Sequence, residues 1–276
     1  MSNALMQTLT SWARNEARIS PDVFACRFYE GCNRSVGGRL GPGTGCQMSY
    51  VGRRYAPEED PAAFRLVVVG MDHGEKSCGD YEVTQYGLER AYQVGEGDFN
   101  QHYRGVVRTA VAVFGDGAAY CRANCGSRCT GGSRPDTAAA CVINRIVQPN
   151  VVKCTPEHQN DRRSRTTWDM WLNCAHHLAH ELRLLQPHLV VFHGSWAPEA
   201  VLGALTAAGA GAEPVEGAPR AGARNVLYRS APLGTHILFL HHPSYGHLDR
   251  QWDPVVEPCL GFLRERGLIP PRVAAT

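Results

Sequence analysis

The sequence predicts an α/β fold, a doubly wound α/β/α sandwich around a central, mainly parallel sheet of four strands. Three observations lead to this prediction. Four short apolar runs have the length and the continuous hydrophobicity of strands that are covered on both faces. Segments with helical spacing of apolar residues alternate with these runs. Polar residues follow three of the four runs, as is typical of the carboxyl ends of strands in an open sheet.

The four strands are expected at residues 64–70, 142–147, 189–193 and 237–240. The first is the clearest, because Phe-Arg-Leu-Val-Val-Val-Gly is almost continuously apolar. This continuous run suits a central parallel strand that is covered on both faces, whereas the run at 142–147 contains Asn144 and Arg145.

Helical spacing predicts shorter helices at residues 6–18, at 101–114, after the turn at 194–198, and at 255–266. The longest predicted helix begins at Thr166 or Thr167, either of which can cap it, and runs to about Leu185. Cys174 lies on the apolar side of this helix. Its thiol is therefore expected to point into the protein.

Glycine and cysteine mark segments without a clear periodic pattern. Residues 26–45 are expected to form a loop, residues 115–140 an insertion, and residues 207–223 a mobile Gly/Ala-rich loop. The whole chain, residues 1–276, is expected to be one domain. Within it, residues 1–60 supply an N-terminal helix and a cysteine-rich loop, and residues 115–140 supply a second cysteine-rich segment.

Composition narrows the class of protein. A hydrophobic content of 43% supports a sizeable core, while a net charge of +2 gives no bulk signal for nucleic-acid binding. The 11 cysteines are an odd number, which argues against a complete disulfide framework. No apolar run approaches the roughly 18 residues that a membrane span needs, and no signal-peptide pattern follows the amino terminus. We therefore expect a cytoplasmic protein whose cysteines bind metal.

Three predicted strands end in side chains that can do chemistry. Residues 72–75, Asp-His-Gly-Glu, follow the first strand; Asn150 follows the second; residues 241–244, His-His-Pro-Ser, follow the last. Because ligands of open parallel sheets bind beyond the carboxyl ends of strands, these residues are expected to form one site.

Three motifs near these ends occur in a recognisable order. They are Val69-Gly70-Met71-Asp72-His73-Gly74-Glu75, Asn150-Val-Val-Lys-Cys154-Thr-Pro156 and His242-Pro243-Ser244. The second is similar to Asn-Val-Val-Lys-Cys-Arg-Pro, the third to His-Pro-Ser, and the first to Gly-Glu-Ala-Pro-Gly or Gly-Gln-Asp-Pro-Tyr. The chain thus resembles the uracil-DNA glycosylase superfamily, especially its iron–sulfur (family 4) branch.

The resemblance implies a role for each motif in releasing a base that is flipped out of DNA. Asn150 would read the Watson–Crick edge of uracil, since an amide offers both a donor and an acceptor. His242 would donate to uracil O2 as negative charge moves onto the base. Asp72 would position the water and stabilise the sugar cation, with Glu75 as the alternative carboxylate.

Other residues of these motifs would line the base pocket. They are Gly70, Met71, His73, Gly74 and Ser244. An aromatic ring should also stack on the base, and Tyr81, Tyr86 and Phe99 are the candidates, with Tyr81 closest to the first motif. His73 replaces the family's proline, so a protein that binds nucleic acid with little excision is the alternative hypothesis.

The resemblance also implies a metal centre. Cys154 and Cys174 match the second cysteine pair of the branch, and the first pair would come from Cys26, Cys32 and Cys46. Four thiolates suit a [4Fe–4S] cluster, with zinc as the alternative. A second metal site is a further hypothesis, and it would involve Cys121, Cys125, Cys129 and Cys141.

The expected partner is DNA that contains uracil or a related damaged base, bound by a nucleoid-associated monomer. Phosphate contacts are expected from basic side chains near the second motif and from residues after His-Pro-Ser. These candidates are Lys153, Arg162, Arg163, Arg165, Tyr245 and Arg250. The expected activity is hydrolysis of the N-glycosidic bond in base-excision repair.

Overall fold

The computed structural model describes most of the chain. Described are residues 3–20, 23–40, 48–52, 54–56, 60, 62–71, 101–114, 142–154, 166–194, 198–243 and 247–271. Predictions that concern residues in the gaps between these ranges stay predictions.

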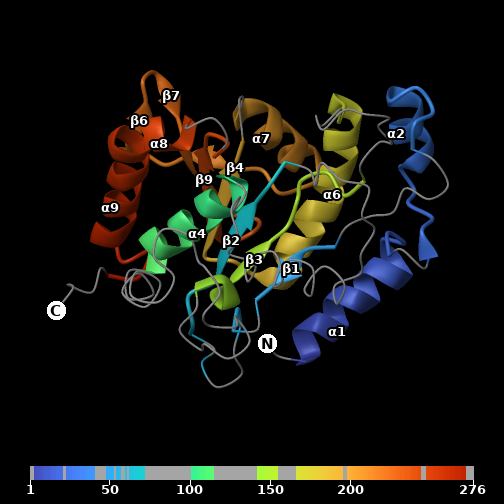
Figure 1. Ribbon diagram of the computed structural model, residues 1–276, viewed down its shortest axis with the longest axis horizontal. Helices are drawn as coiled ribbons and strands as arrows, with labels where there is room; N and C mark the ends of the chain where they lie inside the picture. Colours follow the sequence, from blue (N-terminus) through green and yellow to red (C-terminus); the bar gives the residue numbers. More distant parts are fainter. Residues whose placement is uncertain are drawn as a thin grey trace.

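Residues 142–145 of the second predicted strand form a 3-10 helix, η4 (Val142–Arg145), so that part of the prediction is wrong. The central sheet otherwise contains strands at all four predicted positions, side by side and parallel (Figure 1). They are β3 (Ile146–Gln148), β2 (Leu66–Val69), β4 (Leu189–His193) and β9 (Thr235–Leu240), in that order across the sheet. Their continuous apolar runs are explained by complete burial, since every residue of β2 and β4 is buried. The prediction of a mainly parallel sheet is confirmed.

The predicted number of four strands is wrong, because the described part of the chain already contributes seven strands to the sheet. Three antiparallel strands extend its edges: β1 (Tyr50–Val51) beside β3, β8 (Leu227–Ser230) beside β9, and β5 (Glu213–Pro214) beside β8. β1 and β5 have only two residues each, and β8 contains Arg229 and Ser230, so these strands lack the continuous apolar signal of the central ones. The predicted loop at 207–223 also contains β6 (Arg220–Ala221), which pairs with β7 (Arg224–Asn225).

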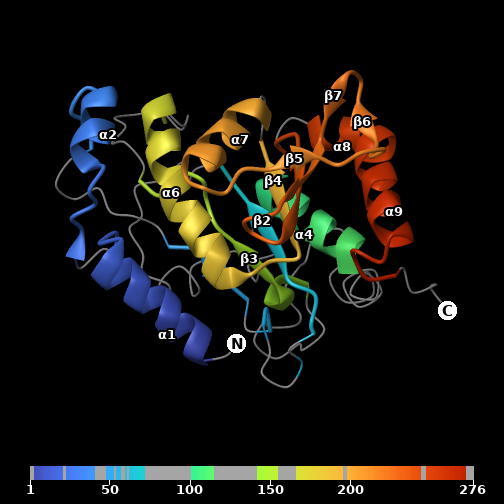
Figure 2. The same cartoon turned by 180° about the vertical axis from the view of Figure 1, so that it is seen from behind.

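Helices cover both faces of the sheet, and alternate residues of β2 point into two separate cores (Figures 1 and 2). Leu66 and Val68 face the core formed with α4 (Gln101–Phe114), the π-helix η6 (Trp252–Val256) and α9 (Glu257–Glu265). Val67 and Val69 face the core formed with the remaining larger helices. These are α1 (Asn3–Ser11), the π-helix η1 (Trp12–Glu16), α2 (Tyr29–Ser35), α6 (Trp168–Leu185) and α7 (Pro198–Ala207).

The predicted helix ends follow from capping. The Thr167 hydroxyl accepts the Met170 N–H at the start of α6, as one of the two predicted caps. Gln186 ends the helix in the left-handed conformation with φ +47°. The segment 26–45, predicted as a loop, contains α2, so that prediction is wrong for seven residues. Within the described ranges, none of the helices combines the length and the apolar character of a membrane span.

Candidate functional site

The carboxyl ends of β2 and β3 are joined directly beyond their last strand residues. Gly70 and Asn150 form a parallel bridge in which the Gly70 N–H donates to the Pro149 carbonyl at 2.9 Å. The Val151 N–H donates in turn to the Gly70 carbonyl, also at 2.9 Å. These bonds hold Asn150 beside the first motif, and its half-buried position leaves the residue in reach of solvent.

The carboxyl ends of β4 and β9 are also joined to each other, and they lie beside the first motif. Gly194 follows β4 with φ +100°, and its N–H donates to the Leu240 carbonyl at 3.0 Å. A Cβ atom at Gly194 would lie 2.7 Å from Met71 Cγ and 3.2 Å from His242 Cδ2. Glycine is therefore required here for both the backbone angle and the close approach of two side chains. Met71 and His242 thus adjoin each other at Gly194, and Asn150 is bridged to Gly70 directly before Met71.

The turn that carries His242 packs against the helix α4. Pro243 is buried against Gly105 of α4, where a Cβ atom would lie only 2.2 Å from Pro243 Cγ. The backbone N–H of His241 donates to Gln251 Oε1 at 2.7 Å, while the His241 side chain is exposed. His242 is half-buried and adjoins Gly194, so it is the member of the pair that faces the strand ends.

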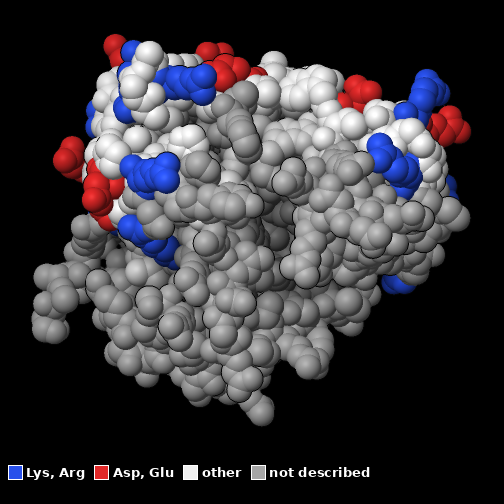
Figure 3. Space-filling view, turned by 45° about the horizontal axis from the view of Figure 1, so that its top comes forward, with Lys and Arg blue, Asp and Glu red and all other residues white. Residues whose placement is uncertain are grey.

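Several predicted site residues lie outside the described residues. They are Asp72, His73, Gly74, Glu75, Tyr81, Tyr86, Phe99 and Ser244 for the base pocket, and Arg162, Arg163, Arg165 and Tyr245 for DNA. Arg250 is described and is exposed on the short helix α8 (His247–Gln251). On the face in Figure 3, acidic and basic side chains of the described residues are interspersed.

Lys153 is not placed as the sequence predicted. Its side chain is 1% exposed, and its ammonium pairs at 2.6 Å with the equally buried carboxylate of Glu181 on α6. The Ser49 hydroxyl donates to the other oxygen of Glu181, and Lys153 Nζ donates to Ser49 Oγ at 3.3 Å. A buried, paired ammonium does not reach a DNA phosphate, so the prediction of a phosphate contact does not fit this burial. The ion pair instead ties the segment after β3 to α6.

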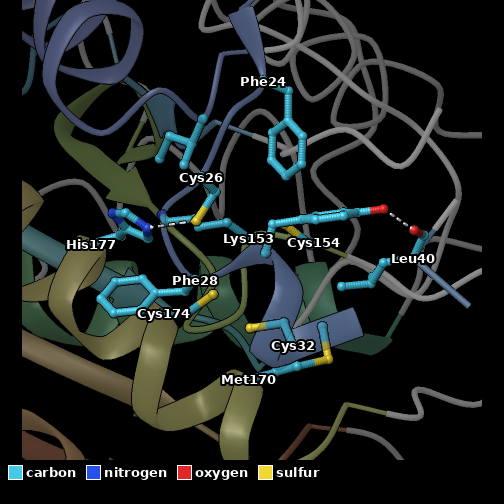
Figure 4. A pocket seen from close by; sticks show the side chains of 12 residues that line it. Phe24, Cys26, Phe28, Cys32, Leu40, Lys153, Cys154, Met170, Cys174 and His177 are labelled. Atoms are coloured by element: carbon cyan, nitrogen blue, oxygen red, sulfur yellow. Dashed lines mark hydrogen bonds between the residues drawn. The ribbon is translucent and has the colours of Figure 1, made fainter. Parts of the chain in front are cut away.

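Beside this ion pair, four cysteines from distant parts of the chain line one cavity. Cys26 precedes α2 and Cys32 lies within it, Cys154 follows β3, and Cys174 belongs to α6. Figure 4 shows their sulfur atoms around the same space. Of the three cysteines proposed for the first pair, the structure places Cys26 and Cys32 here, while Cys46 lies outside the described residues.

The cavity has an apolar wall, which makes it a poor place for free anions. Its other lining residues include Ile19, Phe24, Phe28, Leu40 and Met170. Burial raises the pKa of Cys26 to about 11, and the neighbouring cysteines add to this effect. Burial also raises the pKa of Cys32 and, further, that of Cys174. Thiolates in this cavity therefore need a bound cation to balance their charge.

Two of the four sulfurs are held by side chains of α6. Cys26 Sγ lies 3.3 Å from His177 Nε2, and Asn173 Nδ2 donates to Cys32 Sγ at 3.3 Å. Burial, followed by the charge of Lys153, lowers the pKa of His177 to about 3, so its ring is neutral. Among the described residues, no group of three or more Cys, His, Asp or Glu side chains is placed to hold a single metal ion.

Comparisons with known proteins agree with part of the resemblance. No curated protein matches the chain by sequence. Residues 128–253 match the family model of the uracil DNA glycosylase superfamily, and they contain Asn150, Cys154, Cys174 and His242. This region covers a little less than half of the chain. The first motif and the cysteines of the N-terminal segment precede it.

Proposed function

We propose that the protein is a DNA glycosylase that hydrolyses the N-glycosidic bond of uracil, or of a related deaminated base, in base-excision repair. One observation carries this proposal: Met71 and His242 adjoin Gly194, and Asn150 is bridged to Gly70 directly before Met71, all at the carboxyl ends of parallel strands. Open α/β sheets bind their ligands at this edge. Two of the three residues lie in the segment that matches the superfamily, which suggests glycosylase activity.

Asn150 is proposed to recognise the base. Its amide oxygen accepts and its amide nitrogen donates, and the N3–H and O4 of uracil offer the complementary pair. Cytosine presents the opposite pattern at these two positions, so it would leave both groups of the amide unpaired. The backbone bonds that flank Asn150 fix its position before a base arrives.

His242 is proposed to stabilise the leaving base. As the glycosidic bond breaks, negative charge develops on the uracil ring, and a donor at O2 lowers the energy of that charge. Pro243 packed on α4 keeps the turn rigid, so the imidazole need not reorganise during the reaction. Asp72 is proposed to position the attacking water, with Glu75 as the alternative carboxylate.

DNA is the proposed partner. The target base would flip out of the DNA stack to reach the strand ends that carry Asn150 and His242. Arg250 is exposed on α8, eight residues after His242 in the sequence, and suits a phosphate contact. The arginines at 162, 163 and 165 are proposed for the same role. Lys153 is not part of this set, because it is committed to Glu181.

Cys26, Cys32, Cys154 and Cys174 are proposed to hold a [4Fe–4S] cluster as a structural centre. The support is their common cavity, whose wall is largely apolar and whose Lys153 ammonium is already paired with Glu181. A single zinc would need its four sulfurs about 4 Å apart, given its tetrahedral geometry. A four-iron cluster gives each sulfur its own iron, and the resemblance to the iron–sulfur branch favours it over zinc.

A uracil-excision assay tests the function. Iron-replete protein is incubated with a uracil-containing oligonucleotide in single-stranded, U:A and U:G form, and alkali then cleaves the strand at abasic sites. We expect cleavage with the wild-type protein and none on the thymine-containing control. Salt-sensitive DNA binding without cleavage on any of the three would reject excision and favour the nucleic-acid-binding alternative.

A further inference from the structure

The helix α6 contacts the cysteine cavity through three side chains that share one face. Cys174 lines the cavity itself, while Asn173 and His177, four residues apart, each reach a cysteine of the N-terminal segment. Asn173 is bonded to Cys32, and His177 is in contact with Cys26. One helix turn therefore supplies one cysteine and holds two others.

The ring of His177 is fixed by its packing. The side chain is buried, and its ring lies edge-on to Phe28 at 5.6 Å and to Trp12 at 6.3 Å. These contacts come from the segment that carries Cys26 and from η1, so they orient the imidazole edge toward the sulfur (Figure 4). A ring held in this way keeps Nε2 at the sulfur without the entropy cost of ordering it on metal binding.

The chemistry of the sulfur decides which atom donates. A thiolate that binds metal has no proton, so it can only accept hydrogen bonds. His177 must then carry its proton on Nε2 and donate to Cys26, just as the Asn173 amide donates to Cys32. Donors to cluster sulfurs withdraw electron density from them, and this raises the reduction potential and stabilises the bound thiolate.

We propose that His177 and Asn173 are positioning residues of the metal centre, which hold Cys26 and Cys32 in place and raise the centre's reduction potential. This inference rests on the metal centre proposed above and not on the excision reaction. It also explains how a glycine-rich segment with a wide cysteine spacing keeps two ligands in place, since α6 holds each of them from outside.

The test compares variants of the full chain reconstituted anaerobically with iron and sulfide. His177→Leu removes the donor but keeps a buried apolar side chain, and His177→Gln restores an N–H at similar reach. The matched control is His176→Leu, since the His176 ring stacks on Phe28 at 5.4 Å and contacts the same segment. The measurements are iron release to a chelator and the reduction potential.

We expect His177→Leu to release iron at least about 10-fold faster than the wild type and to have a more negative potential. His177→Gln should recover both properties, and His176→Leu should keep them. Wild-type retention and potential in His177→Leu would overturn the proposal. If this variant does not fold, Asn173→Asp decides in the same way, because it replaces the donor to Cys32 with an acceptor of equal size.

A wild-type protein that takes up no iron would overturn this inference together with the cluster, whatever its excision activity. A wild type that holds iron but excises no uracil leaves the inference fully testable and rejects only the proposed reaction. The two failures are therefore distinguishable.

Discussion

Asn150 and Cys154 lie on the same short segment after β3, yet they belong to different sites. Asn150 is bridged to Gly70 at the strand ends, whereas Cys154 lines the cysteine cavity beside α6. Between them, Val151 and Val152 are buried and bonded to the backbone of Gly70 and Met71. The segment therefore joins the proposed base pocket to the proposed metal centre through a rigid connection, and the two ends can be tested separately.

Replacing Asn150 should remove base recognition and leave the fold intact. The hydrogen bonds that hold this segment are made by the backbone, so Asn150→Ala keeps them. We expect uracil excision to fall by about 10²-fold or more, as for the loss of a group that positions the reacting substrate. The measurement is single-turnover cleavage, with iron content as the control. Undiminished excision would show that Asn150 does not contact the base.

Replacing Cys154 should have the opposite result. Cys154→Ser removes one thiolate from the cavity, and we expect loss of most bound iron and a lower melting temperature. The matched control is Cys259→Ser, since Cys259 is also buried but lies in the other core, near the Pro219 carbonyl. If both variants keep iron equally well, Cys154 is not a ligand.

The central fold was predictable because its strands are buried on both faces. Continuous apolar runs identified β2, β4 and β9, and the helical spacing over residues 101–114 identified α4 with its observed bounds. The helix α2 was not predictable, since Tyr-Glu-Gly-Cys-Asn-Arg-Ser contains glycine and few strong helix formers. It forms against α6, where Ser35 Oγ and Thr167 Oγ1 are 2.6 Å apart.

Site residues were predictable only where a recognisable motif lies within one segment of the sequence. Motifs named Asn150 and His242, but the role of Gly194 depends on Met71 and His242 from other strands. The contact of His177 with Cys26 spans 151 positions and has no local pattern. A glycine directly after an apolar strand was the available sign for Gly194. Lys153 was misread because its partner Glu181 lies on a separate helix.

The Lys153–Glu181 pair should be needed as a unit. Lys153→Met would leave the Glu181 carboxylate buried without its counter-charge, and we expect a loss of about 3–5 kcal/mol in the free energy of unfolding. The double variant Lys153→Met with Glu181→Leu removes both charges and should recover most of that loss. Urea unfolding measures each variant. The pairing would be contradicted if the loss of unfolding free energy in the double variant equalled the sum of the losses in the two single variants.

Gly194 should not tolerate a side chain. Gly194→Ala places a Cβ atom against Met71 in a backbone conformation with φ +100°, so we expect a loss of about 1–3 kcal/mol from backbone strain alone. Excision should fall as well, because Met71 or His242 must move. Gly203→Ala in α7 is the control. Its Cβ meets no heavy atom within 4 Å, and it should gain about 0.5–1 kcal/mol.

Stability should decrease in acid through His188. Burial, and then the charge of Arg65, lowers the pKa of His188 below its usual 6.5, and its Nδ1 accepts the Arg65 backbone N–H at 2.9 Å. The unfolded chain therefore binds this proton more readily than the folded protein, so stability falls as the pH drops through 6.5. His188→Asn keeps an acceptor for the Arg65 N–H but does not titrate. Urea unfolding at pH 8 and pH 5 should show a smaller acid loss in this variant than in the wild type. Equal losses would mean that His188 is not the group that senses acid.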